Sequence, residues 1–206
     1  MAYFPLCINL DGANVILLGD GQEAQAKRDI LLSFGANIRV FSEKEDSQWE
    51  EDPAVELVHR SFQQSDLEPR PALVVVAEVP WAEKERVSQL CRNRGVPVNV
   101  VDVPDLCSFY FPSLVTKGCL TVAVSTAGKS PGGAAWLRRH LENHIPEQTG
   151  EILEWSYSLR QWLCTEYPEA DRRAILRSAL SQALTENRLL TEEEIQTILQ
   201  RHKDNG

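Results

Sequence analysis

The chain has 206 residues, a formal net charge of −9 and 43% hydrophobic residues, which is enough for one full domain and a smaller second part. The acidic balance argues against a general nucleic-acid binder, which needs a basic face. We expect a cytoplasmic protein that does not enter a membrane, because no apolar run approaches the ~18 residues of a span, the N-terminus lacks a signal-peptide pattern, and the five cysteines are scattered like reduced thiols.

The first motif joins a buried strand to a helix. Val15–Leu18 is an apolar run of four residues, typical of a central strand covered on both faces. The run leads into Gly-Asp-Gly-Gln-Glu-Ala at positions 19–24, a G-x-G-x-x-A sequence, and then into a predicted helix over 22–34 and a predicted strand over 37–41. Strand, helix and strand in this order form a βαβ unit.

The glycine turn of this unit predicts a site for a dinucleotide. Gly19 permits the tight turn, Gly21 lets backbone amides approach a pyrophosphate, and the helix N-terminus adds the positive end of its dipole. Glu43 follows the second strand, about 20 residues farther on, where an acid accepts hydrogen bonds from a ribose and disfavours a 2′-phosphate. A glycine-rich turn without a nucleotide is the alternative, since Asp20 and Glu23 add negative charge beside the phosphate position.

Strands and helices continue to alternate up to residue 101. We predict strands over 55–58, 73–77 and 98–101, a helix over 82–93, and an acidic, solvated loop with a weak helix over 43–51. This order predicts a doubly wound parallel sheet. Asp102 follows the last strand, at the sheet edge where ligands of α/β proteins collect, although it could also cap a turn with Pro104.

The pattern changes after Pro104. Predicted strands over 109–115 and 120–124 flank a turn at Lys117-Gly118, and a predicted helix runs from Pro131 to about residue 143. Amphipathic helices are predicted over 151–167 and 169–186, and a third begins at the capping box Thr191-x-x-Glu194. We therefore expect a dinucleotide-type domain over about 1–112 and a second part of strands and helices over 113–206.

Several segments of the chain resemble one known family. The matching segments are Tyr3–Leu6, the glycine turn with Lys27, Val98–Pro104, Leu106–Phe109, Phe111–Ser113 and Ala123–Pro131, within roughly residues 1–145. They are similar to the N-terminal module of siroheme synthases, which is a precorrin-2 dehydrogenase and often also a sirohydrochlorin ferrochelatase.

The resemblance implies an activity and an architecture. The activity is NAD-dependent oxidation of precorrin-2 to sirohydrochlorin, followed in many members by insertion of Fe²⁺ at the same site, in a homodimer built through the second half. The architecture is an α/β fold with a Rossmann-type, NAD-binding parallel sheet domain over 1–112, a small strand-plus-helix region for dimerisation and the active site over 113–147, and a helical C-terminal domain over 148–206. The alternatives are an enzyme that only inserts metal and a non-catalytic protein that binds NAD or a tetrapyrrole on the same scaffold.

The resemblance also implies the residues of the site. Asp102 would be the catalytic carboxylate, which can accept the proton lost alongside a hydride, and Thr126 stands where the family has an active-site serine that can be phosphorylated. The cofactor contacts would be Gly19, Gly21, Gln22, Glu23, Glu43 and Lys44. The substrate contacts would be Asn99, Ser125, Lys129 and Ser130. No residue is expected to hold a resident metal.

One segment departs from the family pattern. Family members usually carry Thr-Asp-Asp after the strand at 73–77, where this chain has Glu78-Val79-Pro80. The change removes a hydroxyl and a carboxylate from near the nicotinamide end of the cofactor, and it motivates the alternative of an enzyme that only inserts metal.

Two groups of side chains in the second part allow a structural interpretation as well as a functional one. Ser125, Thr126 and Ser130 could form only a capping network for the helix that follows them. His140 and His144 have the i, i+4 spacing that can chelate a metal on a helix, but the neighbouring charges favour a solvated surface pair.

Overall fold

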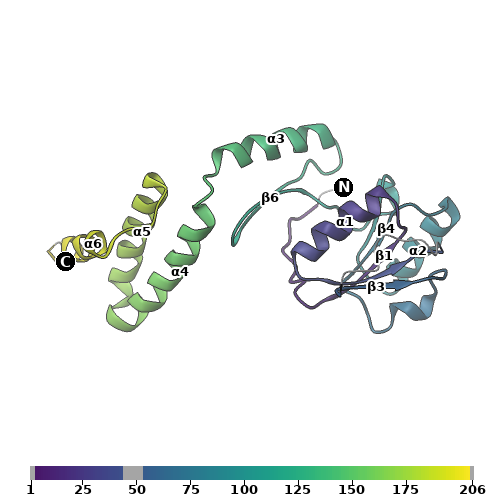
Figure 1. Cartoon of the computed structure of the whole chain (residues 1–206), viewed down its shortest axis with the longest axis horizontal. Helices are drawn as coiled ribbons and strands as arrows, with labels where there is room; N and C mark the ends of the chain where they lie inside the picture. Colours follow the sequence, from purple (N-terminus) through teal and green to yellow (C-terminus); the bar gives the residue numbers. More distant parts are fainter. Residues whose placement is uncertain (1–2, 44–52, 205–206) are drawn as a thin grey trace. The chain divides into compact units, whose positions relative to one another are not determined.

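The structure is a computed structural model that describes residues 3–43 and 53–204 (Figure 1). The chain divides into two compact units, Met1–Phe111 and Pro112–Gly206, and each is described by itself. Within the described ranges, none of the helices combines the length and the apolar character that crossing a membrane requires.

The first unit is built on a five-stranded parallel sheet with the strand order β3-β2-β1-β4-β5. The strands are β1 (Asn14–Leu18), β2 (Asn37–Phe41), β3 (Val55–Val58), β4 (Leu73–Val76) and β5 (Val98–Val100). This confirms the predicted doubly wound parallel sheet. In the register of the sheet, Leu18 lies beside both Phe41 and Val76, and Val76 lies beside Val100. The carboxyl ends of these four strands are therefore level.

Helices cover both faces of this sheet, which explains why the inner strands β1 and β4 are apolar almost throughout. Alternate residues of β1 enter different cores: Val15 and Leu17 pack with α1 (Gln22–Ser33), while Ile16 and Leu18 pack with α2 (Trp81–Asn93) and the 3₁₀ helix η1 (Gln64–Leu67). All four residues are at most 3% exposed. The βαβ unit and the helix after Pro80 are thus confirmed within one residue of their predicted bounds.

An ion pair between the exposed Arg60 and the buried Asp66 fixes the connection between β3 and β4. Asp66 is 7% exposed, and its carboxylate accepts hydrogen bonds from both terminal nitrogens of Arg60 at 2.8 and 2.6 Å and from the Gln63 amide at 2.7 Å. The hydrogen bonds from Arg60 lower the pKa of Asp66 below its usual value, against the opposing effect of burial.

Replacing Asp66 by Asn is expected to lower the free energy of unfolding at neutral pH by about 1 kcal/mol, because the buried Asp66 side chain loses its charge-assisted hydrogen bonds from Arg60, whose guanidinium is itself open to solvent. Since the pKa of Asp66 is lower in the folded state, the wild-type contribution is complete above the unfolded pKa and is lost as the pH falls below about 4. Urea unfolding at neutral and acid pH should show the difference shrinking in acid. Asp29→Asn, which breaks an exposed pair with Arg28, is the control and should change stability little; equal losses in both variants would contradict this account.

The second unit joins a two-stranded hairpin to four helices. Its elements are β6 (Ser113–Lys117), β7 (Leu120–Val124), α3 (Pro131–His144), α4 (Thr149–Glu166), α5 (Glu169–Glu186) and α6 (Glu192–Asp204). The last three helices share a core that includes Ile152, Leu163 and Ile175. The predicted capping box is confirmed, because the Thr191 hydroxyl accepts a hydrogen bond from the Glu194 amide and the Glu194 carboxylate accepts one from the Thr191 amide.

The predicted strand over 109–115 is wrong in its first half. Strand β6 begins at Ser113, and Phe109 and Phe111 instead pack against the α1 side of the first unit's core. Their alternation resembles a strand because both rings point to the same core, while Pro112 has no amide proton for a ladder. The weak helix predicted over 43–51 lies outside the described residues except for Glu43, which is in a bend.

Candidate functional site

In the first unit, the turns that carry the predicted site residues follow the carboxyl ends of the strands. The Gly19 amide donates to the Phe41 carbonyl at 3.0 Å, the Ala77 amide to the Leu18 carbonyl at 2.9 Å, and the Val101 amide to the Val76 carbonyl at 2.8 Å. The chain runs outward from β1 to β2 and later returns to place β4 on the other side of β1. The strand order therefore reverses between β1 and β4, where open α/β sheets bind their ligands.

The glycine turn lies at this switch point, and its backbone requires glycine at position 19. Gly19 has φ +103°, and a Cβ atom there would lie 2.8 Å from the backbone nitrogen of Glu78. A Cβ atom on Gly21 would lie 2.5 Å from Oε1 of Glu78. Helix α1 begins directly after Gly21, which provides no side-chain cap, so the first amides of the helix need a partner from another part of the chain or from a ligand.

The carboxylate of Glu78 lies against these first amides of α1. It accepts a hydrogen bond from the Glu23 amide at 2.7 Å and another from the Ala24 amide at 3.3 Å. A helix N-terminus that follows two glycines, Gly19 and Gly21, suits a phosphate group in charge and in shape. The turn therefore fits the pyrophosphate of a dinucleotide, once the exposed side chain of Glu78 rotates away. This contact was not predicted from the sequence, although the position of Glu78 at the end of a neighbouring strand was a usable signal.

The other predicted cofactor residues lie on the same side of the sheet. Gln22 and Glu23 are exposed in the first turn of α1, and Glu43 is exposed just after β2, where it accepts a hydrogen bond from the Ser61 hydroxyl. Between them, the Ser42 hydroxyl donates to the Asp20 carboxylate at 2.8 Å. Lys44 lies outside the described residues.

Asp102 follows β5 with its backbone in the left-handed region. Its φ is +63°, and the turn that holds it is closed by a hydrogen bond from the Val103 amide to the Val100 carbonyl at 3.1 Å. This conformation costs an L-residue roughly 1–2 kcal/mol, and Asp tolerates it better than most residues. The side chain is exposed at the carboxyl edge of the sheet. The turn thus presents a carboxylate beside the switch point.

A buried thiol supports the turn of Asp102 from inside. Cys107 Sγ accepts a hydrogen bond from the Val100 amide at 3.2 Å and lies 3.2 and 3.3 Å from the carbonyl oxygens of Val100 and Val103, to which it can donate. Burial raises the pKa of the Cys107 thiol, so the group stays protonated at neutral pH. The chain after β5 is further held by Asn99, whose buried side-chain amide donates to the Phe109 carbonyl at 3.0 Å. Asn99 therefore faces the protein rather than the open edge.

Replacing Cys107 by Ala is expected to speed amide hydrogen exchange at Val103 by about fivefold, because the turn loses the hydrogen bonds of the thiol, worth about 1 kcal/mol. Cys107→Ser keeps a donor and an acceptor at the same place and should retain most of the protection. Hydrogen exchange followed by NMR measures both. Unchanged protection in the Ala variant would mean that the thiol does not hold the turn.

The predicted hydroxyl residues of the second unit shape the loop before α3. Ser125 Oγ accepts a hydrogen bond from the Ala127 amide at 3.2 Å, and Thr126 Oγ1 accepts one from the Ser130 amide at 3.1 Å. Ser130 Oγ accepts one from the Gly133 amide at 3.2 Å, which confirms it as the N-cap of α3. Each hydroxyl keeps its own proton for donation, and Lys129 is exposed. Contact of this loop with a substrate stays a prediction.

Comparison with known proteins assigns the first unit to a protein family. Residues 6–113, more than half of the chain, match the family model described as "Putative NAD(P)-binding". The chain belongs to this NAD(P)-binding family. Its cofactor is therefore a nicotinamide dinucleotide, and the match does not distinguish NAD from NADP. Residues 117–144 match a second model, described as "Sirohaem biosynthesis protein central".

Relatives of this NAD(P)-binding chain are siroheme synthases. That of Pseudomonas fluorescens is 34% identical over 176 residues, covering 84% of this chain and 38% of the relative. That of Pseudomonas aeruginosa strain PAO1 is 32% identical over 211 residues, covering 100% of this chain and 45% of the relative. The chain thus spans less than half the length of these curated relatives. The solved structure titled "SirC, precorrin-2 dehydrogenase" has the same fold, with a TM-score of 0.71 at 19% identity over 98% of this chain and 100% of that one.

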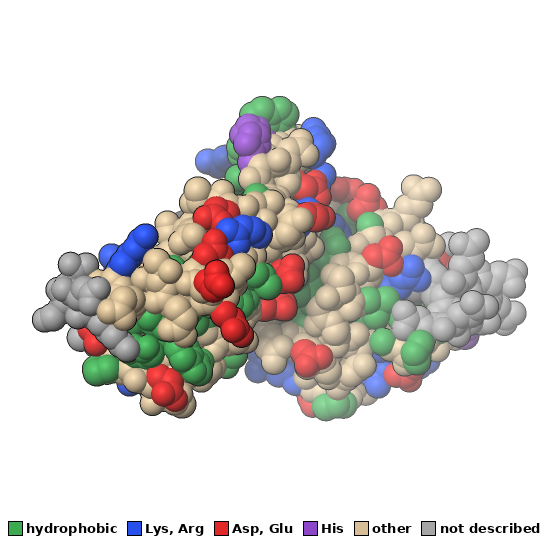
Figure 2. All heavy atoms as spheres, turned by 60° about the vertical axis from the view of Figure 1, so that its left-hand side comes forward, with side chains coloured by type: hydrophobic (Ala, Val, Ile, Leu, Met, Phe, Trp, Pro, Cys, Tyr) green, Lys and Arg blue, Asp and Glu red, His purple; other side chains and the backbone are tan. Residues whose placement is uncertain are grey.

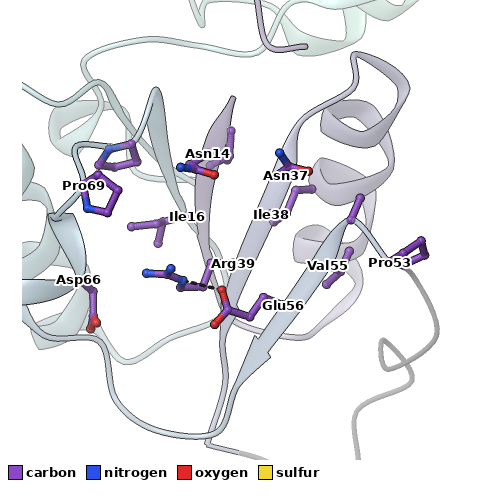
Figure 3. A pocket seen from close by; sticks show the side chains of 13 residues that line it. Asn14, Ile16, Asn37, Ile38, Arg39, Pro53, Val55, Glu56, Asp66 and Pro69 are labelled. Carbon is purple, nitrogen blue, oxygen red and sulfur yellow. Dashed lines mark hydrogen bonds and ion pairs between the residues drawn. The ribbon is translucent and has the colours of Figure 1, made fainter. Parts of the chain in front are cut away.

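A pocket elsewhere in the NAD(P)-binding unit is separate from the site. It is lined by the first residues of β1, β2 and β3, namely Asn14, Asn37 and Val55, and by the ion pair of Arg39 and Glu56 at 2.9 Å (Figure 3). These residues lie at the amino ends of the strands. Because the glycine turn and Asp102 lie at the carboxyl ends, this pocket does not serve the predicted chemistry.

The histidines of α3 form a ladder with a tryptophan on the surface. The His140 ring stacks on Trp136 with centroids 5.3 Å apart and lies 4.2 Å from the ring of His144. Figure 2 shows purple histidine beside green hydrophobic side chains at its top. Across the described residues, no group of three or more His, Cys, Asp or Glu side chains is placed to hold a metal ion.

Proposed function

We propose that the chain is a precorrin-2 dehydrogenase that forms sirohydrochlorin in the biosynthesis of siroheme. The observation that carries the proposal is the joint match of residues 6–113 to an NAD(P)-binding family and of residues 117–144 to a sirohaem biosynthesis family. The names of the siroheme synthase relatives and of the structural neighbour agree with it. We further propose NAD rather than NADP; the exposed acid Glu43 just after β2 supports this, because an acid at the end of the second strand favours a ribose hydroxyl over a 2′-phosphate.

The proposed mechanism assigns roles to residues of the first unit. Oxidation of precorrin-2 removes a hydride and a proton, and the bound nicotinamide ring supplies the hydride acceptor. Asp102 accepts the proton as a general base, for which its exposed carboxylate at the sheet edge is suited. The turn at Gly19 and Gly21 and the amides at the start of α1 hold the pyrophosphate. The remaining proposed cofactor contacts are Gln22, Glu23, Glu43 and Lys44.

The second unit is proposed to hold the tetrapyrrole, whose carboxylates suit hydroxyl donors and a cation. The proposed contacts are Ser125, Thr126, Lys129 and Ser130, with Thr126 also as an active-site hydroxyl. For Asn99, burial and the hydrogen bond to the Phe109 carbonyl support a positioning role in place of the substrate contact that we predicted.

The proposed assembly is a homodimer. Large apolar side chains on α3 support it: Trp136 is 58% exposed and Leu137 is 41% exposed. The proposed parts are an NAD-binding domain over 1–112, a dimerisation and active-site region over 113–147 and a helical domain over 148–206. Cytoplasmic location is supported by the cysteines, all of them described and all free thiols.

A second candidate is an enzyme that only inserts Fe²⁺ into sirohydrochlorin. The contact of Glu78 with the first amides of α1 favours it, because that carboxylate lies where a phosphate group would bind. Anaerobic assays with precorrin-2 and each nicotinamide dinucleotide, and separate assays with sirohydrochlorin and Fe²⁺, distinguish the candidates. A dehydrogenase produces reduced nucleotide, an enzyme that only inserts metal converts added sirohydrochlorin to siroheme without it, and a binding protein does neither.

A further inference from the structure

We infer that Glu78 is an internal competitor of the cofactor's pyrophosphate and sets the affinity of the chain for nicotinamide dinucleotides. The inference rests on the proposed function, because it takes the glycine turn as the place where the dinucleotide binds. It concerns a residue that follows β4, 55 positions along the chain from one of the amides that it contacts.

The contact reproduces that of a phosphate group. Oε1 and Oε2 of Glu78 accept hydrogen bonds from the amides of Glu23 and Ala24, the second and third residues of α1. The Glu78 carboxylate also fills the space that the missing side chain of Gly21 leaves open, at 2.5 Å from the ideal Cβ position. A negatively charged group thus lies on the helix dipole, within hydrogen-bond distance of two amides and directly against the glycine surface.

The backbone conformation around Glu78 directs its side chain toward the first amides of α1. The Val79 amide donates to the Ala77 carbonyl at 3.0 Å, which closes a three-residue turn with Glu78 at its centre. Pro80 follows as the N-cap of α2, and its ring restricts the backbone just beyond the turn. Because β4 is the neighbour of β1 in the sheet, this turn faces the glycine turn across the switch point.

Carboxylate and pyrophosphate cannot share the amides. Both are anionic and both need the same two N–H groups, so the side chain of Glu78 must leave before the dinucleotide binds. The measured affinity is then the affinity of the open turn multiplied by the fraction of molecules in which Glu78 has left. This lowers affinity without abolishing binding, since the side chain is exposed and free to rotate into solvent.

If Glu78 served only as a structural cap of α1, its removal would change dinucleotide affinity differently, so the inference can be tested. In both cases removing the carboxylate leaves the first turn of α1 without its anion and lowers the stability of the free protein. If Glu78 is only a cap, dinucleotide affinity stays the same or falls. If Glu78 is a competitor, affinity rises while stability falls.

The experiment compares the full-length wild type with Glu78→Ala and Glu78→Gln. Glu85→Gln is the matched control, because it removes the same charge from an exposed position of α2. NAD⁺ and NADP⁺ are titrated by calorimetry without tetrapyrrole, and thermal unfolding is followed with and without nucleotide. We expect Glu78→Ala to bind dinucleotide about tenfold more tightly and to unfold at a lower temperature when free, Glu78→Gln to lie between it and the wild type, and Glu85→Gln to match the wild type.

The outcomes also separate this inference from the proposed function. Equal or weaker binding by Glu78→Ala overturns the inference, and precorrin-2 oxidation by the wild type at saturating nucleotide would leave the proposed function standing. Failure of the wild type and both Glu78 variants to bind either nucleotide overturns the inference and the nucleotide-dependent function together.

Discussion

Replacing Asp102 by Asn is expected to lower the rate of precorrin-2 oxidation by about 10²–10⁴-fold while the protein stays folded, which is the usual contribution of a positioned general base. Asn has nearly the shape of Asp and, like it, tolerates the left-handed backbone that Asp102 adopts at φ +63°. The substitution therefore removes the charge and the basicity without changing the turn.

The control for Asp102→Asn is Asp105→Asn, which removes the same charge from an exposed residue of the short 3₁₀ helix η2 (Pro104–Leu106). Both variants are compared for initial rate at saturating precorrin-2 and nucleotide, and for nucleotide affinity. Only Asp102→Asn should lose rate, and neither should lose affinity. A fully active Asp102→Asn enzyme would remove Asp102 from the mechanism.

Replacing Gly150 by Ala is expected to lower the free energy of unfolding of the second unit by about 3 kcal/mol, at the upper end of what overpacking costs. Gly150 is in the first turn of α4, and a Cβ atom there would meet the Lys117 carbonyl group and lie 2.8 Å from the Cα atom of Gly118. These are backbone atoms of the turn between β6 and β7, so no side-chain rotation can relieve the overlap.

The control for Gly150→Ala is Gly132→Ala, because nothing lies within 4 Å of a Cβ atom built on Gly132 in α3. That variant should be more stable than the wild type by about 0.5–1 kcal/mol, since Ala favours a helix over Gly. Denaturant unfolding followed by the fluorescence of Trp155 and Trp162, both in α4, measures the two changes. Wild-type stability in Gly150→Ala would show that the hairpin and α4 are not packed at this distance.

Local sequence patterns predicted most of the fold. The strands β1 and β4 read as short apolar runs because both faces of a parallel sheet are covered. The glycine turn and the capping pairs at Ser130 and Thr191 were also predictable, since each depends on residues within a few positions of one another.

Contacts between distant segments could not be predicted in the same way. The hydrogen bonds from α1 to Glu78 depend on β1 and β4 being neighbours and on a turn that aims one side chain. The requirement for glycine at position 150 depends on the close approach of the hairpin turn between β6 and β7, which lies about 30 residues earlier in the chain. The Cys119 thiol of this turn also donates a hydrogen bond to the Gly150 carbonyl. The strand predicted at Phe109 and Phe111 was wrong because the two rings alternate for a reason other than strand pairing. They pack as a pair on a core formed by other elements.

The most direct test of the proposed dehydrogenase is anaerobic hydride transfer from precorrin-2 to NAD⁺ in a single turnover, compared between the wild type and Asp102→Asn at saturating nucleotide. We predict that the wild type forms reduced nucleotide and sirohydrochlorin in equal amounts, and that Asp102→Asn binds NAD⁺ but forms both products about 10²–10⁴-fold more slowly. Absence of reduced nucleotide in the wild type with both NAD⁺ and NADP⁺ would contradict the proposed function.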